Sequence, residues 1–171
     1  MRAVVVYESL WGNTAAVARA VAEGIGGDAV ALSTADADAG RVAAADLIVA
    51  GGPVFAFQLS SERARDDIRD HPQPGAPEPN LSAPSLRTWI ASLPDGRTLV
   101  AAFDTRVRGP FGKGSPTILS ELQSRGYRPL TRPEGFIVQG KYGPLRPGEI
   151  ERARQWGEQL RDLAAEALAS Q

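Results

Sequence analysis

The sequence predicts a doubly wound α/β domain, in which helices cover both faces of a parallel sheet. Short apolar runs alternate with helical patterns along the chain, which is typical of parallel strands joined by crossover helices. Residues 4–7 and 47–50 are continuously apolar, as expected of strands that are buried on both faces. A length of 171 residues is usual for one domain. We therefore expect residues 1–171 to form a single domain.

Five strands and five helices are expected in order along the chain. The predicted strands cover residues 4–7, 28–32, 47–50, 98–103 and 135–139, and the predicted helices cover residues 14–25, 39–45, 85–93, 115–125 and 147–169. Apolar residues recur every four positions in the first helix, and Gly26-Gly27 ends it because glycine accepts the left-handed conformation there. Gly51-Gly52-Pro53 is expected to end the third strand. Residues 55–80 are predicted to be irregular, with a proline-rich loop inside the domain.

Composition excludes several classes of function. The formal net charge is −1, so no bulk field favours nucleic acid or an anionic membrane. The chain has no cysteine and a single histidine, which excludes disulfides, thiolate metal sites and multi-histidine metal sites within one chain. The N-terminal apolar run is too short for a signal peptide or a membrane span. We expect a cytoplasmic protein that does not bind nucleic acid or insert into membranes, and any redox chemistry would need a bound organic cofactor.

The loop after the first predicted strand has the composition of a phosphate-binding loop. In open α/β sheets, ligands bind beyond the carboxyl ends of the strands. Ser9 and Thr14 supply hydroxyl donors there, and Gly12 lets the backbone approach a ligand closely. The following helix presents its N-terminal amides and the positive end of its dipole. Residues 7–14 contain no lysine or arginine, which suits a monophosphate better than a triphosphate with its Mg²⁺ and P-loop lysine.

Residues 5–21 also resemble the signature of the flavodoxin family. The matching features are two apolar residues and an aromatic, followed by serine, glycine, threonine, alanine and a closing aliphatic residue at the family's spacings. The resemblance implies a flavodoxin-like fold in three layers, with a five-stranded parallel sheet in the order 2-1-3-4-5. It also implies FMN as the cofactor, and neither a metal nor a catalytic residue is expected.

The same resemblance implies three loops around FMN. The phosphate loop would comprise Ser9, Leu10, Trp11, Gly12, Asn13 and Thr14; the loop after the third strand would contribute Pro53, Val54, Phe55, Ala56 and Phe57; the loop after the fourth strand would contribute Asp104, Thr105, Arg106, Gly109 and Phe111. An isoalloxazine ring needs flat apolar surfaces, so Phe55 or Phe57 would stack on it or else pack in the core. Asp104 would contact the ring edge or cap a turn.

The resemblance implies a flavoprotein that transfers electrons through FMN. Family members are commonly acidic, whereas this chain is nearly neutral and carries six cations against two anions between residues 104 and 132. Cations near a flavin would raise its reduction potential. Two alternatives stay open: an FMN-dependent NAD(P)H:quinone-type oxidoreductase, and a non-redox ligand- or partner-binding module. The partner would be a redox protein or a small-molecule electron donor or acceptor, and the sequence leaves the oligomeric state open.

Overall fold

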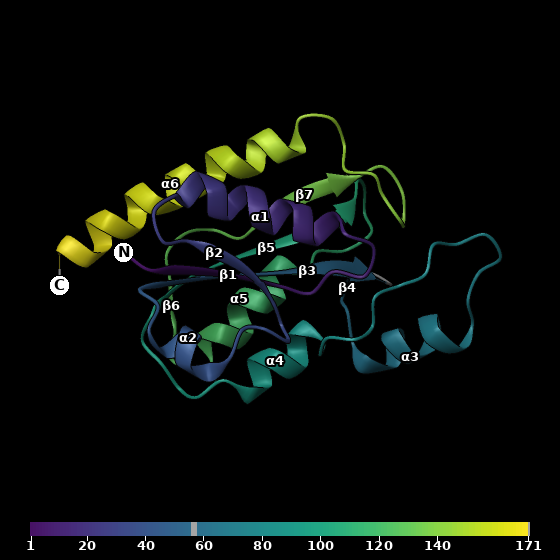
Figure 1. Ribbon diagram of the computed structural model, residues 1–171, viewed down its shortest axis with the longest axis horizontal. Coiled ribbons are helices and arrows are strands. Elements are labelled where there is room, and N and C mark those ends of the chain that lie inside the picture. Colours follow the sequence, from purple (N-terminus) through teal and green to yellow (C-terminus); the bar gives the residue numbers. More distant parts are fainter. Residues whose placement is uncertain (56–57, 171) are drawn as a thin grey trace.

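The computed structural model describes residues 1–55 and 58–170 (Figure 1). In chain order, the elements are β1 (Ala3–Tyr7), α1 (Asn13–Ile25), β2 (Val30–Ser33), α2 (Ala39–Ala43), β3 (Leu47–Phe55), β4 (Gln58–Leu59), α3 (Glu62–Asp70), α4 (Leu86–Ser92), β5 (Leu99–Val107), α5 (Ser115–Gln123), β6 (Arg128–Pro129), β7 (Glu134–Val138) and α6 (Glu149–Ala169).

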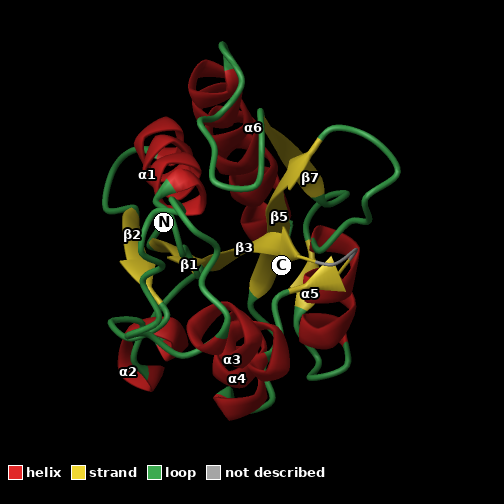
Figure 2. Cartoon of the chain, turned by 90° about the vertical axis from the view of Figure 1, so that its right-hand side faces the viewer, coloured by secondary structure: helices red, strands yellow, loops and turns green. Residues whose placement is uncertain are grey.

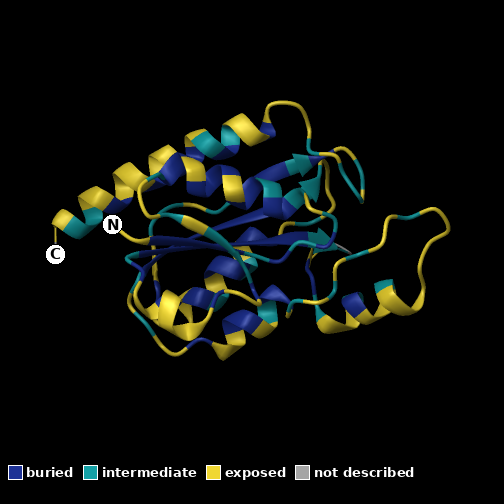
Figure 3. Ribbon diagram, viewed as in Figure 1, coloured by how far each residue is buried: buried dark blue, intermediate teal, exposed yellow. Residues whose placement is uncertain are grey.

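These elements form three layers around one sheet, which confirms the predicted fold class. Helices α1 and α6 cover one face, and α2, α4 and α5 cover the other, as Figure 2 shows in a view onto one end of the sheet. Side chains of neighbouring strand residues alternate between the two cores: Val5 packs under α1 and α6, whereas Val4 packs over α2 and α4. The strands are buried throughout their central parts (Figure 3).

The predicted number and order of strands differ from the structure. Within the described residues the sheet has seven strands, in the order β2-β1-β3-β5-β6, with β4 paired to β3 and β7 paired to β5. Strand β4 is a two-residue antiparallel return of the chain onto the end of β3. The far edge consists of two strands because β6 pairs with the beginning of β5 and β7 with its end. Pro129 lies in β6 on this edge, where a missing amide donor is tolerated.

Gly51 and Gly52 do not end β3, contrary to the prediction. The strand continues to Phe55 because both glycines serve close packing inside it. A Cβ atom on Gly51 would lie 2.0 Å from the nearest ring atom of Phe103, and one on Gly52 would lie 2.8 Å from a methyl group of Leu59. The extension carries the end of β3 beyond the sheet's buried part, to the edge where the candidate site lies.

The prediction of irregular structure at residues 55–80 is wrong where the chain forms β4 and α3, and it is confirmed for the proline-rich residues 71–80. Helix α3 is mostly exposed (Figure 3) and has no apolar stripe. Its N-terminus is capped by Ser61, whose hydroxyl oxygen accepts a hydrogen bond from the Ala64 amide. The buried residue of α3 is Arg65, so a search for hydrophobic periodicity cannot find this helix.

Helix α6 is attached to β7 through the carboxylate of Glu149, which is 2% exposed. Burial alone would raise the pKa of Glu149, but hydrogen bonds from Arg152, the Ile137 amide and Arg146 outweigh it and lower this pKa below its ordinary value. In the described part of the chain, no helix combines the length and the apolar character needed to cross a membrane.

Because the folded-state pKa of Glu149 is lowered, its ionised form stabilises the fold at neutral pH, and this contribution disappears as the pH falls through that pKa. Glu149→Gln should therefore lower the free energy of unfolding by about 1–2 kcal/mol at pH 7. The difference from the unmodified protein should shrink in urea titrations at pH 3. Glu151→Gln, an exposed change in the same helical turn, serves as the control. If Glu149→Gln lowers the free energy of unfolding by the same amount at pH 7 and pH 3, the ionised carboxylate is not what stabilises the fold.

Candidate functional site

The candidate site is a cavity of about 320 Å³ where the loops after β1, β3, β5 and β7 meet. We call it the first cavity. Its lining residues are Ser9, Leu10, Trp11, Asn13, Thr14, Pro53, Val54, Phe55, Thr105, Arg106, Val107, Phe111, Val138 and Lys141. The structure thus brings together most of the site residues predicted from the three loops, at the edge of the sheet where α/β folds bind ligands.

One end of the first cavity is formed by the N-terminus of α1. Gly12 is the N-cap residue with φ of +89°, a left-handed conformation that glycine adopts without strain. Having no side chain, Gly12 cannot cap the helix, whereas α2, α3 and α4 are capped by Asp38, Ser61 and Ser85. Among the described residues, no side chain accepts a hydrogen bond from the first amides of α1. Such a helix end favours an anion.

Two hydroxyl groups join this helix end to β5. Thr14 is 2% exposed, and its Oγ1 lies 2.7 Å from Oγ1 of Thr105. Since a hydroxyl can donate once and accept twice, one hydrogen of the pair is left to donate to a ligand. The hydroxyl oxygen of Ser9 accepts from the Gly12 amide at 3.1 Å, which holds the loop closed. The hydrogen of Ser9 is likewise left for a ligand.

The remaining walls of the first cavity are mainly apolar. Val54 and Phe55 come from the end of β3, and Val107 and Val138 come from the ends of β5 and β7. The Trp11 ring meets the Phe55 ring edge to face, with centroids 5.5 Å apart. These surfaces suit a flat aromatic ligand.

Asp104 does not line the cavity, and the expectation of a ligand contact from its side chain is not met. The carboxylate is fully buried and accepts hydrogen bonds from the amides of Gly114 and Ser115, at 2.9 and 2.8 Å. It therefore caps α5, which is the alternative role that the sequence left open. It also accepts from Nη1 of Arg106 at 2.7 Å.

Arg106 does line the cavity, and Asp104 fixes its position. The guanidinium lies against the backbone of β7, where a Cβ atom on Gly135 would come within 2.2 Å of its Cζ. Arg106 is half-buried, and its side chain is 19% exposed. Its positive charge, partly balanced by Asp104, thus stands at the cavity wall.

Four other predicted residues are not placed in the lining. Gly12 and Gly109 act through the backbone: Gly109 has φ of +128°, and the Phe111 ring packs against it. Ala56 and Phe57 lie outside the described residues.

Three residues that were not among the predicted site residues also line the cavity: Val107, which lies within the predicted loop of residues 104–111, and Val138 and Lys141, which the sequence analysis missed. All three lie where a parallel strand ends or just beyond it, so the carboxyl-edge rule could have found them once β5 was extended and the loop after β7 was included.

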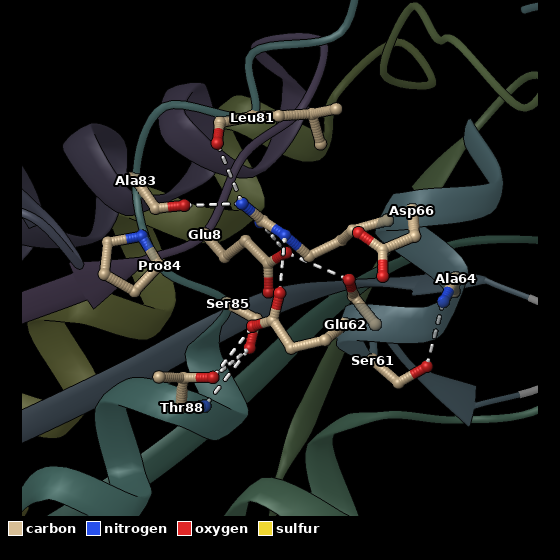
Figure 4. Close-up of polar contacts among 12 residues, drawn as sticks. Glu8, Ser61, Glu62, Ala64, Asp66, Leu81, Ala83, Pro84, Ser85 and Thr88 are labelled. Atoms are coloured by element: carbon tan, nitrogen blue, oxygen red, sulfur yellow. Dashed lines mark hydrogen bonds and ion pairs between the residues drawn. The ribbon is translucent and has the colours of Figure 1, made fainter. Parts of the chain in front are cut away.

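Sequence reasoning also missed Glu8, which stands next to the phosphate loop and is 2% exposed. Its carboxylate accepts hydrogen bonds from Ser60 at 2.9 Å, from Nη1 of Arg65 at 2.7 Å and from the Leu86 amide at 2.8 Å. Arg65 in turn donates to the carbonyl oxygens of Leu81 and Ala83, as the contacts drawn around Glu8 in Figure 4 show. The ion pair ties the carboxyl end of β1 to α3, and the hydrogen bond from the Leu86 amide ties it to the start of α4.

Solved structures of known proteins share this architecture. A flavodoxin from the domain Archaea superposes with a TM-score of 0.68 at 19% identity, over 96% of this chain and 99% of its own. Flavodoxin 1 from Bacillus cereus superposes with a TM-score of 0.65 at 17% identity, over 95% of this chain and 98% of its own. A WrbA-like flavodoxin protein from Agrobacterium tumefaciens superposes with a TM-score of 0.61 at 20% identity, over 96% of this chain and 98% of its own. The chain has the flavodoxin-like fold. No protein-family model matches the sequence, and no curated protein matches it either.

The flavodoxin-like fold places the first cavity at the end of the sheet where its three predicted loops converge. Within residues 1–55 and 58–170, no group of three histidine or acidic side chains could hold a metal ion. The site offers neutral hydrogen-bond donors, apolar walls and two cations, Arg106 and Lys141.

Proposed function

We propose that the chain is a redox protein that binds FMN in the first cavity and transfers electrons through it. The observation that carries this proposal is the side-by-side placement of an uncapped helix N-terminus and apolar aromatic walls in one cavity. A volume of about 320 Å³ lies in the usual range of small-ligand sites. The likeness to solved flavodoxins supports the same proposal.

The residues of the first cavity suit the two ends of FMN. The α1 amides and the hydroxyls of Ser9 and Thr14 would hold the phosphate dianion without a cation in the loop. Phe55, Phe111 and the valines would exclude water from the ring. When bound, the flavin supplies the ability to take up and release electrons. The chain's part is to orient it and to set the charge around it.

The direct test is titration of the purified protein with FMN, followed by absorbance spectra through stepwise reduction. Tight binding with a perturbed flavin spectrum is the expected result. Absence of binding would overturn the proposal and leave the non-redox alternative. If flavin is bound, steady NAD(P)H oxidation with a quinone and no partner reductase would favour the enzyme, and its absence would favour an electron carrier.

Arg106→Glu should lower the midpoint potential of the bound flavin by an amount on the order of tens of millivolts. The reason is that reduction adds negative charge to the ring, which a nearby cation stabilises and a carboxylate opposes. Arg108→Glu is the matched control, since it makes the same change of charge at an exposed residue two positions later, just after β5, that does not line the cavity. Equal potentials for the two variants would show that Arg106 does not act on the ring. A spectroelectrochemical titration measures both.

A further inference from the structure

A second cavity of about 390 Å³ lies beside the first. It is enclosed by the C-terminal part of α3, by residues 71–81 and by Tyr142. Trp11 and Lys141 line both cavities. The second cavity has no role in the proposed binding of FMN.

The loop over the second cavity is held at three points. The Asn80 amide donates to the Leu10 carbonyl oxygen at 2.8 Å, and Nε1 of Trp11 donates to the Pro77 carbonyl oxygen at 3.1 Å. The Tyr142 hydroxyl donates to Oε1 of Gln73 at 2.9 Å. These bonds connect residues 73–80 to the phosphate loop and to the segment after β7. The walls of the second cavity are therefore held in place by specific hydrogen bonds.

Aromatic rings form the wall between the two cavities. The Trp11 ring contacts Phe55 on one side and Tyr142 on the other, with ring centroids 5.5 and 4.7 Å apart. Phe55 lines the first cavity and Tyr142 lines the second. A ligand in the second cavity would therefore lie across Trp11 from a ligand in the first.

The lining of the second cavity selects a class of ligand. Its apolar surface comes from Trp11, Ile68, three prolines and Leu81, and proline and aromatic faces pack well on flat rings. Lys141 and Gln73 are among the lining residues that can donate hydrogen bonds into it. Lys141 forms no ion pair with any described residue and lies 5.5 Å over the Tyr142 ring. Gln73 accepts the hydrogen bond from Tyr142 through Oε1. The two hydrogens on Nε2 of Gln73 take no part in that bond and can donate to a ligand.

The charged residues that line the second cavity are Asp67, Arg69, Glu78 and Lys141. Among the described residues neither Glu78 nor Lys141 forms an ion pair, so Lys141 is the cation available to a ligand, and Glu78 adds a negative charge to the same lining. Arg69 is bonded to Asp66 and Asp70, and Asp67 lies 3.2 Å from Nδ1 of His71. We propose that the second cavity binds a planar aromatic compound that carries carbonyl or carboxylate oxygens, with its ring along Trp11 and Tyr142 and its oxygens toward Lys141 and Gln73. This site goes beyond the proposed FMN site and does not depend on it.

Three probes of one size test the proposal by isothermal calorimetry on the folded protein. We expect 2-naphthoate and naphthalene-2-carboxamide to bind, because both are planar and carry an oxygen acceptor. Decahydro-2-naphthoate has the same charge but no flat ring, and we expect it to bind at least about tenfold more weakly. Equal affinity for the flat and the saturated acid would overturn the proposal.

Crossed cavity-filling variants locate the probe. Ile68 lines the second cavity, and Val107 lines the first. Ile68→Trp should weaken naphthoate at least about tenfold and leave FMN bound, whereas Val107→Trp should do the reverse. If Val107→Trp abolishes the binding of naphthoate and Ile68→Trp does not, the probe binds in the first cavity and the proposal is overturned. Because FMN and naphthoate are titrated separately, failure of the FMN site is distinguishable from failure of this one.

Lysine variants give a second test that does not require a bulky insertion. Lys141→Ala should weaken naphthoate by about threefold more than the neutral carboxamide, the order expected of an exposed ion pair. Lys113→Ala is the matched control, since Lys113 is also exposed and lines neither cavity. If both lysine variants weaken naphthoate equally, long-range charge explains the binding and the assigned contact is wrong.

Discussion

Arg65→Met should lower the free energy of unfolding by about 3–5 kcal/mol, the cost of leaving a buried charge without its partner. Arg65 is 5% exposed and Glu8 is 2% exposed, and their atoms lie 2.7 Å apart. Methionine can fill much of the space, but it cannot neutralise the Glu8 carboxylate. Urea denaturation monitored by circular dichroism measures the loss.

The control for this prediction is Arg63→Met, the same substitution at an exposed residue of the same helix. It should change the free energy of unfolding by less than about 0.5 kcal/mol. The double variant Glu8→Gln/Arg65→Met removes both charges and should be less destabilised than the sum of its two single variants. Additive single effects, or equal effects of Arg63→Met and Arg65→Met, would show that the ion pair contributes little to stability.

The same variant should also weaken ligand binding at the first cavity. Glu8 directly precedes Ser9, and the ion pair ties the end of β1 to α3 and the segment before α4. Losing it releases the phosphate loop from one of its supports.

The parts of the fold that local patterns encode were predictable. The buried runs of β1 and β3 and the four-residue spacing in α1 correctly predicted buried sheet strands and a helix directly after β1. A pattern of this kind works because each side chain's environment is set by its own element. The position of the loop between β1 and α1 was predictable for the same reason, since its serine, glycine and threonine are close in sequence.

The parts that depend on contacts distant in sequence were not predictable. Helix α3 is polar and mostly exposed, and it is anchored to the fold by the pairing of Arg65 with Glu8, 57 positions earlier. Gly51 is needed inside β3 because the ring of Phe103 on the neighbouring strand leaves no room for a Cβ atom there. Asp104 faces α5 because its carboxylate accepts hydrogen bonds from the amides of Gly114 and Ser115, ten and eleven residues later. None of these partners leaves a periodic signal in the sequence.

Thr14→Val should weaken the binding of FMN by about ten- to hundredfold, while the binding of riboflavin should change by less than about threefold. The reason is that a hydrogen bond to a charged phosphate contributes about 1.5–3 kcal/mol, and riboflavin has no phosphate. Thr14 is the buried hydroxyl nearest to the uncapped amides of α1, and valine keeps its shape without its donor. Fluorescence titration with each ligand gives the two dissociation constants.

Thr105→Val separates the phosphate contact from the hydroxyl pair itself. It breaks the same 2.7 Å hydrogen bond from the other side, so any effect of losing the pair should appear in both variants. If Thr14 holds the phosphate, the ratio of FMN to riboflavin affinity should fall much further for Thr14→Val than for Thr105→Val. If instead Thr14→Val weakens both ligands equally, the α1 end of the first cavity holds the wrong end of the ligand, and the proposed orientation of FMN must be reversed.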